Sequence, residues 1–269
     1  TGKTVAMNAK AMYEDPIVAT KVFDCGGKKV GYLAYTSFTF ESCLGLYEVC
    51  KQFKAEGVSE LILDLRYNGG GYVFTETVLA SMLAPESVVK AGSVFETEVW
   101  NDTYMAYYKK QGTDLNTYFT TKFKQTHNDK LYNLDTSDAN IGLTKIYALV
   151  TEDSASASEA ILVGLLPYMD IEIIGQQTHG KYCSGIMWEG KEWFEDLVQS
   201  YKDNKMNFAE KHPDFADWSK YIGQWGIYVM IARYGDKDGN CPCMPDGFIP
   251  DLGATDYFEE PYQLGDERE

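Results

Sequence analysis

The segment SELILDLRYNGGG at residues 59–71 joins a run of apolar residues to a loop rich in glycine. Residues 59–66 are apolar without alternation, which is typical of a strand covered on both faces of a parallel sheet. The glycines that follow leave backbone N–H groups free to point at an oxygen of a ligand, and ligands bind at the carboxyl ends of strands in open α/β sheets. We expect Asp64 and Arg66 to order this loop by pairing. For the loop alone, an Asn-Gly turn without function is the alternative.

Strands and helices alternate on both sides of this segment. Residues 41–57 place Leu44, Tyr47, Cys50 and Phe53 on one predicted helical face, and Gly57 is a natural left-handed cap. We expect strands at 28–38, 59–66, 145–152 and 171–175, and helices at 41–57, in the run that ends at Leu83, and at 154–169. This order predicts an α/β core with a mainly parallel sheet.

Two stretches interrupt the alternation. Residues 86–140 show no clear helix, so we interpret them as a variable excursion, whereas the aromatic-rich residues 189–222 predict a helical insertion or lid. The pattern divides the chain into an N-terminal extension (1–25), a core domain (26–256) and a C-terminal tail (257–269).

The composition excludes several classes of protein. The chain has 269 residues, of which 45% are hydrophobic and 14% aromatic, so it can bury a sizeable core. With 24 basic and 40 acidic residues the net charge is −16, which argues against nucleic acid as a partner. The longest apolar stretch, residues 160–169, is interrupted by Pro167 and is too short to span a bilayer.

The cysteines and acidic residues do not predict a metal site. Six cysteines with three histidines and no CxxC motif make structural zinc a poor fit, so we expect mainly buried free thiols. Cys241 and Cys243 flank Pro242, too close for an easy bridge to each other. DKDGN at 236–240 lacks the glycine and the final acid of a calcium loop and is better explained as a hairpin turn or a surface loop.

The hexapeptide SASASE at 154–159 lies at a predicted strand-to-helix junction. Ser156 with Glu159 forms a capping box, S-x-x-E, and capping is a sufficient explanation of the hexapeptide alone. A serine at a helix N-terminus is also well placed for catalysis, because the helix dipole and free N–H groups stabilise an oxyanion. The position therefore suits a nucleophile without requiring one.

A serine nucleophile needs a base, and two candidates follow in THGK at 178–181. Lys181 lies 25 positions beyond Ser156, and a lysine can act as base where burial disfavours its ammonium form. His179 is the second candidate base, and a solvated turn lysine is the alternative without function.

Together, the segments DLRYNGGG, SASASE and THGK resemble the signature of the C-terminal processing (tail-specific) serine proteases, a family related to the tricorn protease core. The resemblance extends over roughly residues 22 to 252, with GYLAYTSF near its start and GFIPDL (247–252) near its end. It implies a Clp protease/crotonase-like α/β fold without metal or cofactor.

By this resemblance, Ser156 is the nucleophile and Lys181 the general base, and the N–H groups of Ala157 and Gly70 (or Gly71) form the oxyanion hole. The sequence departs from the family pattern at Gly185, where members commonly carry a Gln that orients the lysine. A PDZ domain normally precedes the core, and residues 1–25 are expected to be what remains after such a domain. The resemblance also implies the bacterial cell envelope, the periplasm or outer membrane, with any lipid anchor lying outside this chain.

We therefore expect a serine endopeptidase that cleaves unfolded or extended polypeptides through a Ser–Lys dyad and an acyl-enzyme. The first alternative is a peptide-binding homologue that is weakly active or inactive, which the glycine at 185 motivates. A less favoured alternative is a crotonase-like acyl-CoA enzyme that uses the glycine loop to hold an enolate.

Overall fold

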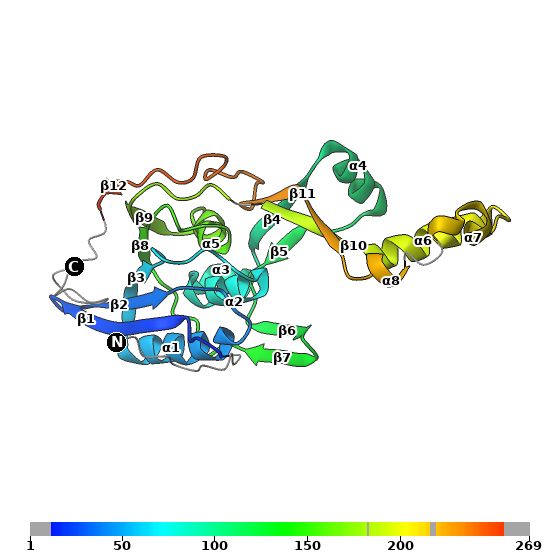
Figure 1. Ribbon diagram of the computed structural model, residues 1–269. Coiled ribbons are helices and arrows are strands. Elements are labelled where there is room, and N and C mark those ends of the chain that lie inside the picture. Colours follow the sequence, from blue (N-terminus) through cyan, green and yellow to red (C-terminus); the bar gives the residue numbers. More distant parts are fainter. Residues whose placement is uncertain (1–11, 182, 216–218, 256–269) are drawn as a thin grey trace, which may run out of the picture.

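Within the residues that the structure describes, the main sheet has six strands, and five of them are parallel to one another (Figure 1). The computed structural model describes residues 12–181, 183–215 and 219–255. The strand order is β1 (Ile17–Cys25), β2 (Lys28–Tyr35), β3 (Val58–Asp64), β8 (Lys145–Val150), β9 (Asp170–Gly175) and β12 (Leu252–Gly253). Only β1 runs antiparallel to its neighbour. The predicted α/β class with a mainly parallel sheet is confirmed.

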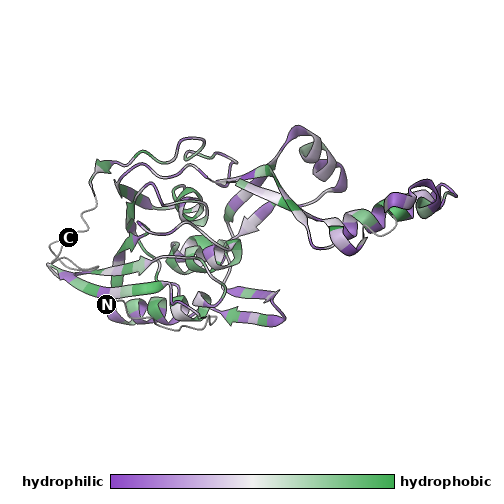
Figure 2. Cartoon of the chain, viewed as in Figure 1, coloured by the Kyte–Doolittle hydropathy of each residue, from purple (hydrophilic) through white to green (hydrophobic). Residues whose placement is uncertain are grey.

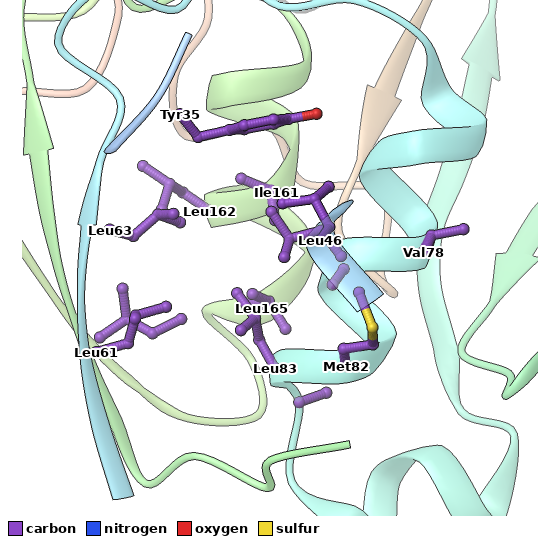
Figure 3. Close-up of a cluster of buried hydrophobic side chains, with 14 of the residues drawn as sticks. Tyr35, Leu46, Leu61, Leu63, Val78, Met82, Leu83, Ile161, Leu162 and Leu165 are labelled. Atoms are coloured by element: carbon purple, nitrogen blue, oxygen red, sulfur yellow. The ribbon is translucent and has the colours of Figure 1, made fainter. Parts of the chain in front are cut away.

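Three helices cover one side of this sheet and form the hydrophobic core with it. They are α1 (Ser42–Glu56), α2 (Val73–Leu83) and α5 (Ala157–Leu165). Figure 3 shows Leu61 and Leu63 of β3 facing Leu162 and Leu165 of α5 and Leu83 of α2. Strand β3, predicted to be covered on both faces, is mostly buried, whereas the residues of β8 alternate between buried and half-buried. The second face carries ion pairs such as Lys145–Glu172.

Helix α1 has the predicted extent but a rotated apolar face. Gly57 ends it in the left-handed conformation, with φ 79°. The residues buried against the core are Ser42, Cys43, Leu46, Cys50 and Phe53. Leu44 was predicted on the buried face and is instead 55% exposed. The predicted face used a strict three-residue step, whereas the helix repeats every 3.6 residues, so Cys43 and Leu46 occupy that face.

The prediction of no clear helix in residues 86–140 was wrong. This stretch contains α3 (Glu86–Ala91), β4 (Val94–Trp100), α4 (Asp102–Gln111), β5 (Asn116–Tyr118), β6 (Lys122–His127) and β7 (Lys130–Asp135). Helix α4 buries no residue, so it carries no core-facing apolar stripe. Its ends are set locally, because the Asn101 side chain caps the first turn and Gly112 ends the helix with φ 67°.

The predicted helical insertion is an arm that extends from the body of the molecule (Figure 1). Strands β10 (Cys183–Glu189) and β11 (Gly226–Gly235) form its base as an antiparallel hairpin, and β11 continues the second sheet, β10–β11–β4–β5. Between the two strands lie α6 (Gly190–Asp203), α7 (Phe208–Lys211), the 3₁₀ helix η1 (Pro213–Phe215) and α8 (Ser219–Ile222).

The predicted N-terminal extension lies partly, and the predicted C-terminal tail entirely, outside the described residues. Strand β1, which we grouped with the N-terminal extension, is the edge strand of the main sheet, so the sheet begins before residue 26. Residues 1–11 of the extension and the predicted tail, 257–269, lie outside the described residues. None of the helices in the described ranges has the length and apolarity needed to cross a membrane.

Candidate active site

Ser156 lies in a left-handed turn immediately before helix α5. Its backbone has φ 59° and ψ −116°, which is uncommon for a residue with a side chain and costs of order 1–3 kcal/mol. The predicted capping box is present, because the Ser156 side chain accepts from the backbone of Glu159 and the Glu159 carboxylate accepts from Ser156 N–H at 3.1 Å. A strained serine at a strand-to-helix turn is the geometry of a nucleophile elbow.

The glycine loop after β3 packs directly on this turn. A Cβ added to Gly70, which has φ 104°, would lie 2.7 Å from Ser156 Cβ and 3.0 Å from Ala157 N. A side chain there would therefore displace the serine, and only glycine allows the two backbones to come this close. The structure thus brings together DLRYNGGG and SASASE, which are far apart in the sequence.

Asn68 holds these two segments in place, although we assigned it no role from the sequence. Its side chain donates to Tyr35 O at 2.9 Å and accepts from Gly70 N–H at 2.9 Å. Its carbonyl oxygen accepts from Ala155 N–H at 3.2 Å and from the Ser158 hydroxyl at 2.8 Å. Asn68 is fully buried, so these bonds are shielded from water. The Asn in the motif, directly before the glycines, was the available sequence signal.

Asp64 and Arg66 form a buried ion pair at the start of the loop. The Arg66 guanidinium donates to both carboxylate oxygens of Asp64, at 3.0 and 2.8 Å, and Tyr32 Oη donates to the same carboxylate at 2.7 Å. The carbonyl of Arg66 accepts from the hydroxyl of Thr151. The pair therefore fixes the end of β3 relative to the segment that leads to Ser156.

The N–H groups named from the sequence for an oxyanion hole differ in whether they already donate a hydrogen bond. Within the ranges that the structure describes, neither Ala157 N–H nor Gly71 N–H has an acceptor, whereas Gly70 N–H already donates to Asn68 Oδ1. Of the two glycines considered from the sequence, Gly71 therefore has the free donor. Phe38 N–H donates to Gly70 O and Tyr72 N–H donates to Phe38 O, so the backbone on either side of Gly71 is held in place.

Glu159 connects the serine turn to the segment that carries Lys181. Its carboxylate is fully buried and accepts from the Thr178 hydroxyl at 2.6 Å and from Gly180 N–H at 2.7 Å, besides Ser156 N–H. The capping box explained Glu159 from the sequence, and these two further bonds had no sequence signal. One carboxylate thus holds both sides of the candidate site.

The two candidate bases are both exposed. Lys181 follows the tethered Gly180, but its side chain makes no ion pair or hydrogen bond among the residues that the structure describes. His179 is held by its backbone, which donates to Ser154 O at 3.0 Å, and its ring makes no hydrogen bond within the same residues. The fold therefore fixes the backbone before Lys181.

Gly185 lies in β10, four residues beyond Lys181, where the family pattern has a Gln. A Cβ at this position would lie 2.2 Å from Val229 O of β11, next to an irregularity in the strand pairing. A side chain at 185 would therefore require β11 to move. The glycine fits the hairpin as it stands.

The motifs set aside from the sequence also have structural explanations. Asp236 N–H donates to Asn240 O at 2.7 Å, so DKDGN is a closed surface turn after β11. No group of three or more metal-binding side chains occurs within residues 12–181, 183–215 and 219–255.

A strained serine at a helix N-terminus, facing a glycine loop on a parallel α/β sheet, is the arrangement of a serine hydrolase. The model of Peptidase family S41 matches residues 29–253, and the chain belongs to this family of C-terminal processing peptidases.

Two kinds of relative agree with this assignment. The chain is 25% identical over 184 residues to a probable CtpA-like serine protease of Staphylococcus aureus, which covers 68% of this chain and 31% of the relative. Its fold is similar to a putative S41 protease from Bacteroides fragilis, with a TM-score of 0.65, 21% identity and coverage of 91% of this chain and 52% of the other. A photosystem II D1 C-terminal processing protease has a TM-score of 0.56 at 17% identity, covering 91% of this chain and 50% of the other. The chain thus spans about a third of the curated relative and about half of each solved structure.

Proposed function

We propose that this chain is the catalytic core of a serine endopeptidase that cleaves unfolded or extended polypeptides through Ser156 and Lys181. The observation that carries the proposal is that three segments meet at Ser156. Gly70 packs against Ser156, and the Glu159 carboxylate accepts hydrogen bonds both from Ser156 N–H and from Gly180 N–H, just before Lys181. Membership of the peptidase family supports the class of reaction.

In the proposed reaction, the neutral amine of Lys181 takes the proton of the Ser156 hydroxyl as the oxygen attacks the peptide carbonyl. Ala157 N–H and Gly71 N–H stabilise the oxyanion that forms. The resulting ammonium returns its proton to the leaving amine, and a water molecule then hydrolyses the ester. Because Lys181 is exposed, we propose that the lysine side chain turns toward Ser156 when substrate covers the site and excludes water.

The test is cleavage of unfolded casein by the purified chain and by Ser156→Ala and Lys181→Met variants. We expect each variant to lose at least about a thousandfold in rate, as removal of a nucleophile or base does. Ser200→Ala and Lys191→Met, at exposed positions of α6, are the matched controls and should cleave at the wild-type rate. The wild-type rate should also rise toward alkaline pH, because only the neutral amine accepts a proton.

A peptide-binding homologue without activity is the second candidate, and the exposed Lys181 side chain together with Gly185 favours it. Labelling of Ser156 by a fluorophosphonate probe separates the two, because the probe needs an activated serine. If wild type and Ser156→Ala cleave casein at the same rate and the probe does not label Ser156, the proposal of a peptidase with Ser156 as nucleophile is rejected.

A further inference from the structure

Cys241 and Cys243 meet in a tight turn after β11. Met244 N–H donates to Cys241 O at 3.2 Å and closes the turn around Pro242, and the two sulfur atoms lie 3.7 Å apart. Their spacing in the sequence argued against an easy bridge, but the turn folds the side chains toward each other. Forming a bond of about 2.05 Å would move the sulfur atoms together by less than 2 Å.

The two thiols differ in access and in acidity. Cys241 is partly exposed, whereas Cys243 is fully buried. A hydrogen bond from the Cys243 thiol lowers the pKa of Cys241, and the positive charge of Arg233 lowers it further against the effect of burial. The same hydrogen bond raises the pKa of Cys243, and burial adds to it. Cys241 is therefore the thiol that ionises first and that a small reagent reaches.

The turn is joined to the candidate active site by the segment that follows it. Gly247 N–H donates to Cys243 O at 2.7 Å, and Phe248 N–H donates to Thr178 Oγ1 at 2.7 Å. Gly180 packs so closely on this segment that an added Cβ would lie 2.2 Å from Pro245 O. Thr178 and Gly180 in turn bind the Glu159 carboxylate. A change in the turn therefore reaches the backbone before Lys181 through two contacts.

We propose that Cys241 and Cys243 form a reversible disulfide by exchange with a low-molecular-weight disulfide, and that its formation shifts residues 244–248 against residues 177–181. In the first step the Cys241 thiolate attacks the reagent RSSR, which gives a mixed disulfide and releases RS⁻. Cys243 then loses its proton and attacks the Cys241 sulfur, which releases a second RS⁻. The dithiol is oxidised by two electrons, and RSSR is reduced to two RSH.

The experiment treats the reduced full chain with oxidised glutathione and counts thiols after denaturation. The count should fall by two from six, and the mass should fall by about 2 Da with no glutathione retained. Peptide mapping should place the bond between residues 241 and 243. Glutathione retained on Cys241, a bridge from Cys241 to Cys183, or free thiols at both 241 and 243 would each overturn the proposal, whereas an adduct on the exposed Cys25 does not bear on it.

Two variants make the order of steps testable. Cys243→Ser should trap glutathione on Cys241, because the second thiol is missing, whereas Cys241→Ser should take up no glutathione at Cys243. Cys243 is fully buried, so far-UV circular dichroism must show that the variant is folded, and Cys243→Ala replaces it if it is not. Cys25→Ser is the matched control, because Cys25 is exposed and distant in sequence from Cys241 and Cys243. This variant should form the bridge as wild type does.

Hydrogen exchange measures the proposed shift without reference to activity. Thr178 N–H and Gly180 N–H are bonded to Phe248 O and Glu159, so their exchange should change on oxidation and return with dithiothreitol. Unchanged exchange in 177–181 would overturn the coupling. A change in casein cleavage on oxidation is expected as well, and this last readout rests on the proposed peptidase function. If Ser156 proves inactive, thiol counts and exchange still decide the disulfide.

Discussion

Two buried glutamates in this protein have opposite surroundings. Glu159 accepts three hydrogen bonds, from Ser156 N–H, the Thr178 hydroxyl and Gly180 N–H. Glu76 in α2 is also buried, but its Oε1 has no hydrogen-bond partner within the part of the chain that the structure describes. Burial raises the pKa of Glu76 well above its ordinary value, and the nearby charge of Glu96 raises it further. Glu159 organises the site, whereas Glu76 makes stability depend on pH.

The expected pH dependence has a definite sign. Because the pKa of Glu76 is higher in the folded than in the unfolded chain, the folded state binds more protons. Its contribution to the unfolding free energy is complete below the ordinary value of 4.5 and is lost as pH rises through the raised pKa. Glu76→Gln has nearly the same shape and no charge, so we expect it to match wild type at pH 4.5 and to be more stable at pH 8.

Urea denaturation at both pH values measures this difference. Glu192→Gln, at an exposed position of α6, is the matched control and should leave the pH dependence of wild type unchanged. A Glu76→Gln variant whose unfolding free energy is lower than wild type at pH 8 would contradict the interpretation.

Helix α5 is the central element of the molecule because it is buried on all sides. Every residue from Ala157 to Leu165 is buried, and the helix packs against α2 as well as the main sheet. Gly164 lets it approach β4, where an added Cβ would lie 2.2 Å from the ring of Phe95 and 2.9 Å from Phe95 O. The helix that begins at Ser156 is thus held between the two sheets.

Gly164→Ala should destabilise the protein. Alanine is more favourable than glycine in a helix by about 1 kcal/mol, but overpacking against Phe95 costs typically 1–3 kcal/mol. The added Cβ would lie 2.9 Å from the backbone oxygen of Phe95, which cannot rotate away as a side chain could. Gly45→Ala in α1 is the matched control, because its Cβ meets only the flexible end of Ile17. We expect a lower unfolding free energy for the first variant in urea and an equal or higher one for the second. The reverse order would contradict this account of packing.

The sequence predicted the elements whose signals are local. The strand-helix order around 28–83 and 145–175 followed from apolar runs and from Gly57, and the motifs predicted that distant segments form one site. Helix α4 was missed because its Tyr104 and Tyr108 pack on Trp100 rather than in the core, so no apolar stripe marks it. The further bonds of Glu159 join segments about 20 residues apart, which no local pattern encodes. The turn that brings the sulfur atoms of Cys241 and Cys243 together is local, but their spacing alone did not indicate it.

At the scale of the whole molecule, the arm is separate from the core. Its helices pack on one another and on β10, and Figure 1 shows them extending away from the main sheet. Apolar and polar residues alternate along them in Figure 2. Large exposed hydrophobic side chains of the arm are Met187, Trp188, Trp193, Met206, Tyr221, Trp225, Ile227, Tyr228 and Met230.

Removal of the arm should leave the core folded. In this variant, the dipeptide Asn-Gly replaces residues 190–225 and connects Glu189 to Gly226, which are paired across the hairpin. Asn-Gly is the sequence that two-residue hairpin turns favour. We expect the unfolding free energy in urea to change by less than about 1 kcal/mol, because no core cavity is created. A loss of several kcal/mol, or loss of the near-ultraviolet circular dichroism of the core, would show that the arm stabilises the body.

The hairpin at the base of the arm adjoins two segments described above, the one that carries Lys181 and the one that carries Cys241 and Cys243. Strand β10 begins two residues after Lys181, and β11 ends six residues before Cys241. Because both connections leave the same hairpin, a rotation of the hairpin would move the chain before β10 and the chain after β11 together. The Ser156 turn is held to the glycine loop by Asn68, and Glu159 ties it to the backbone of Gly180 just before the hairpin begins.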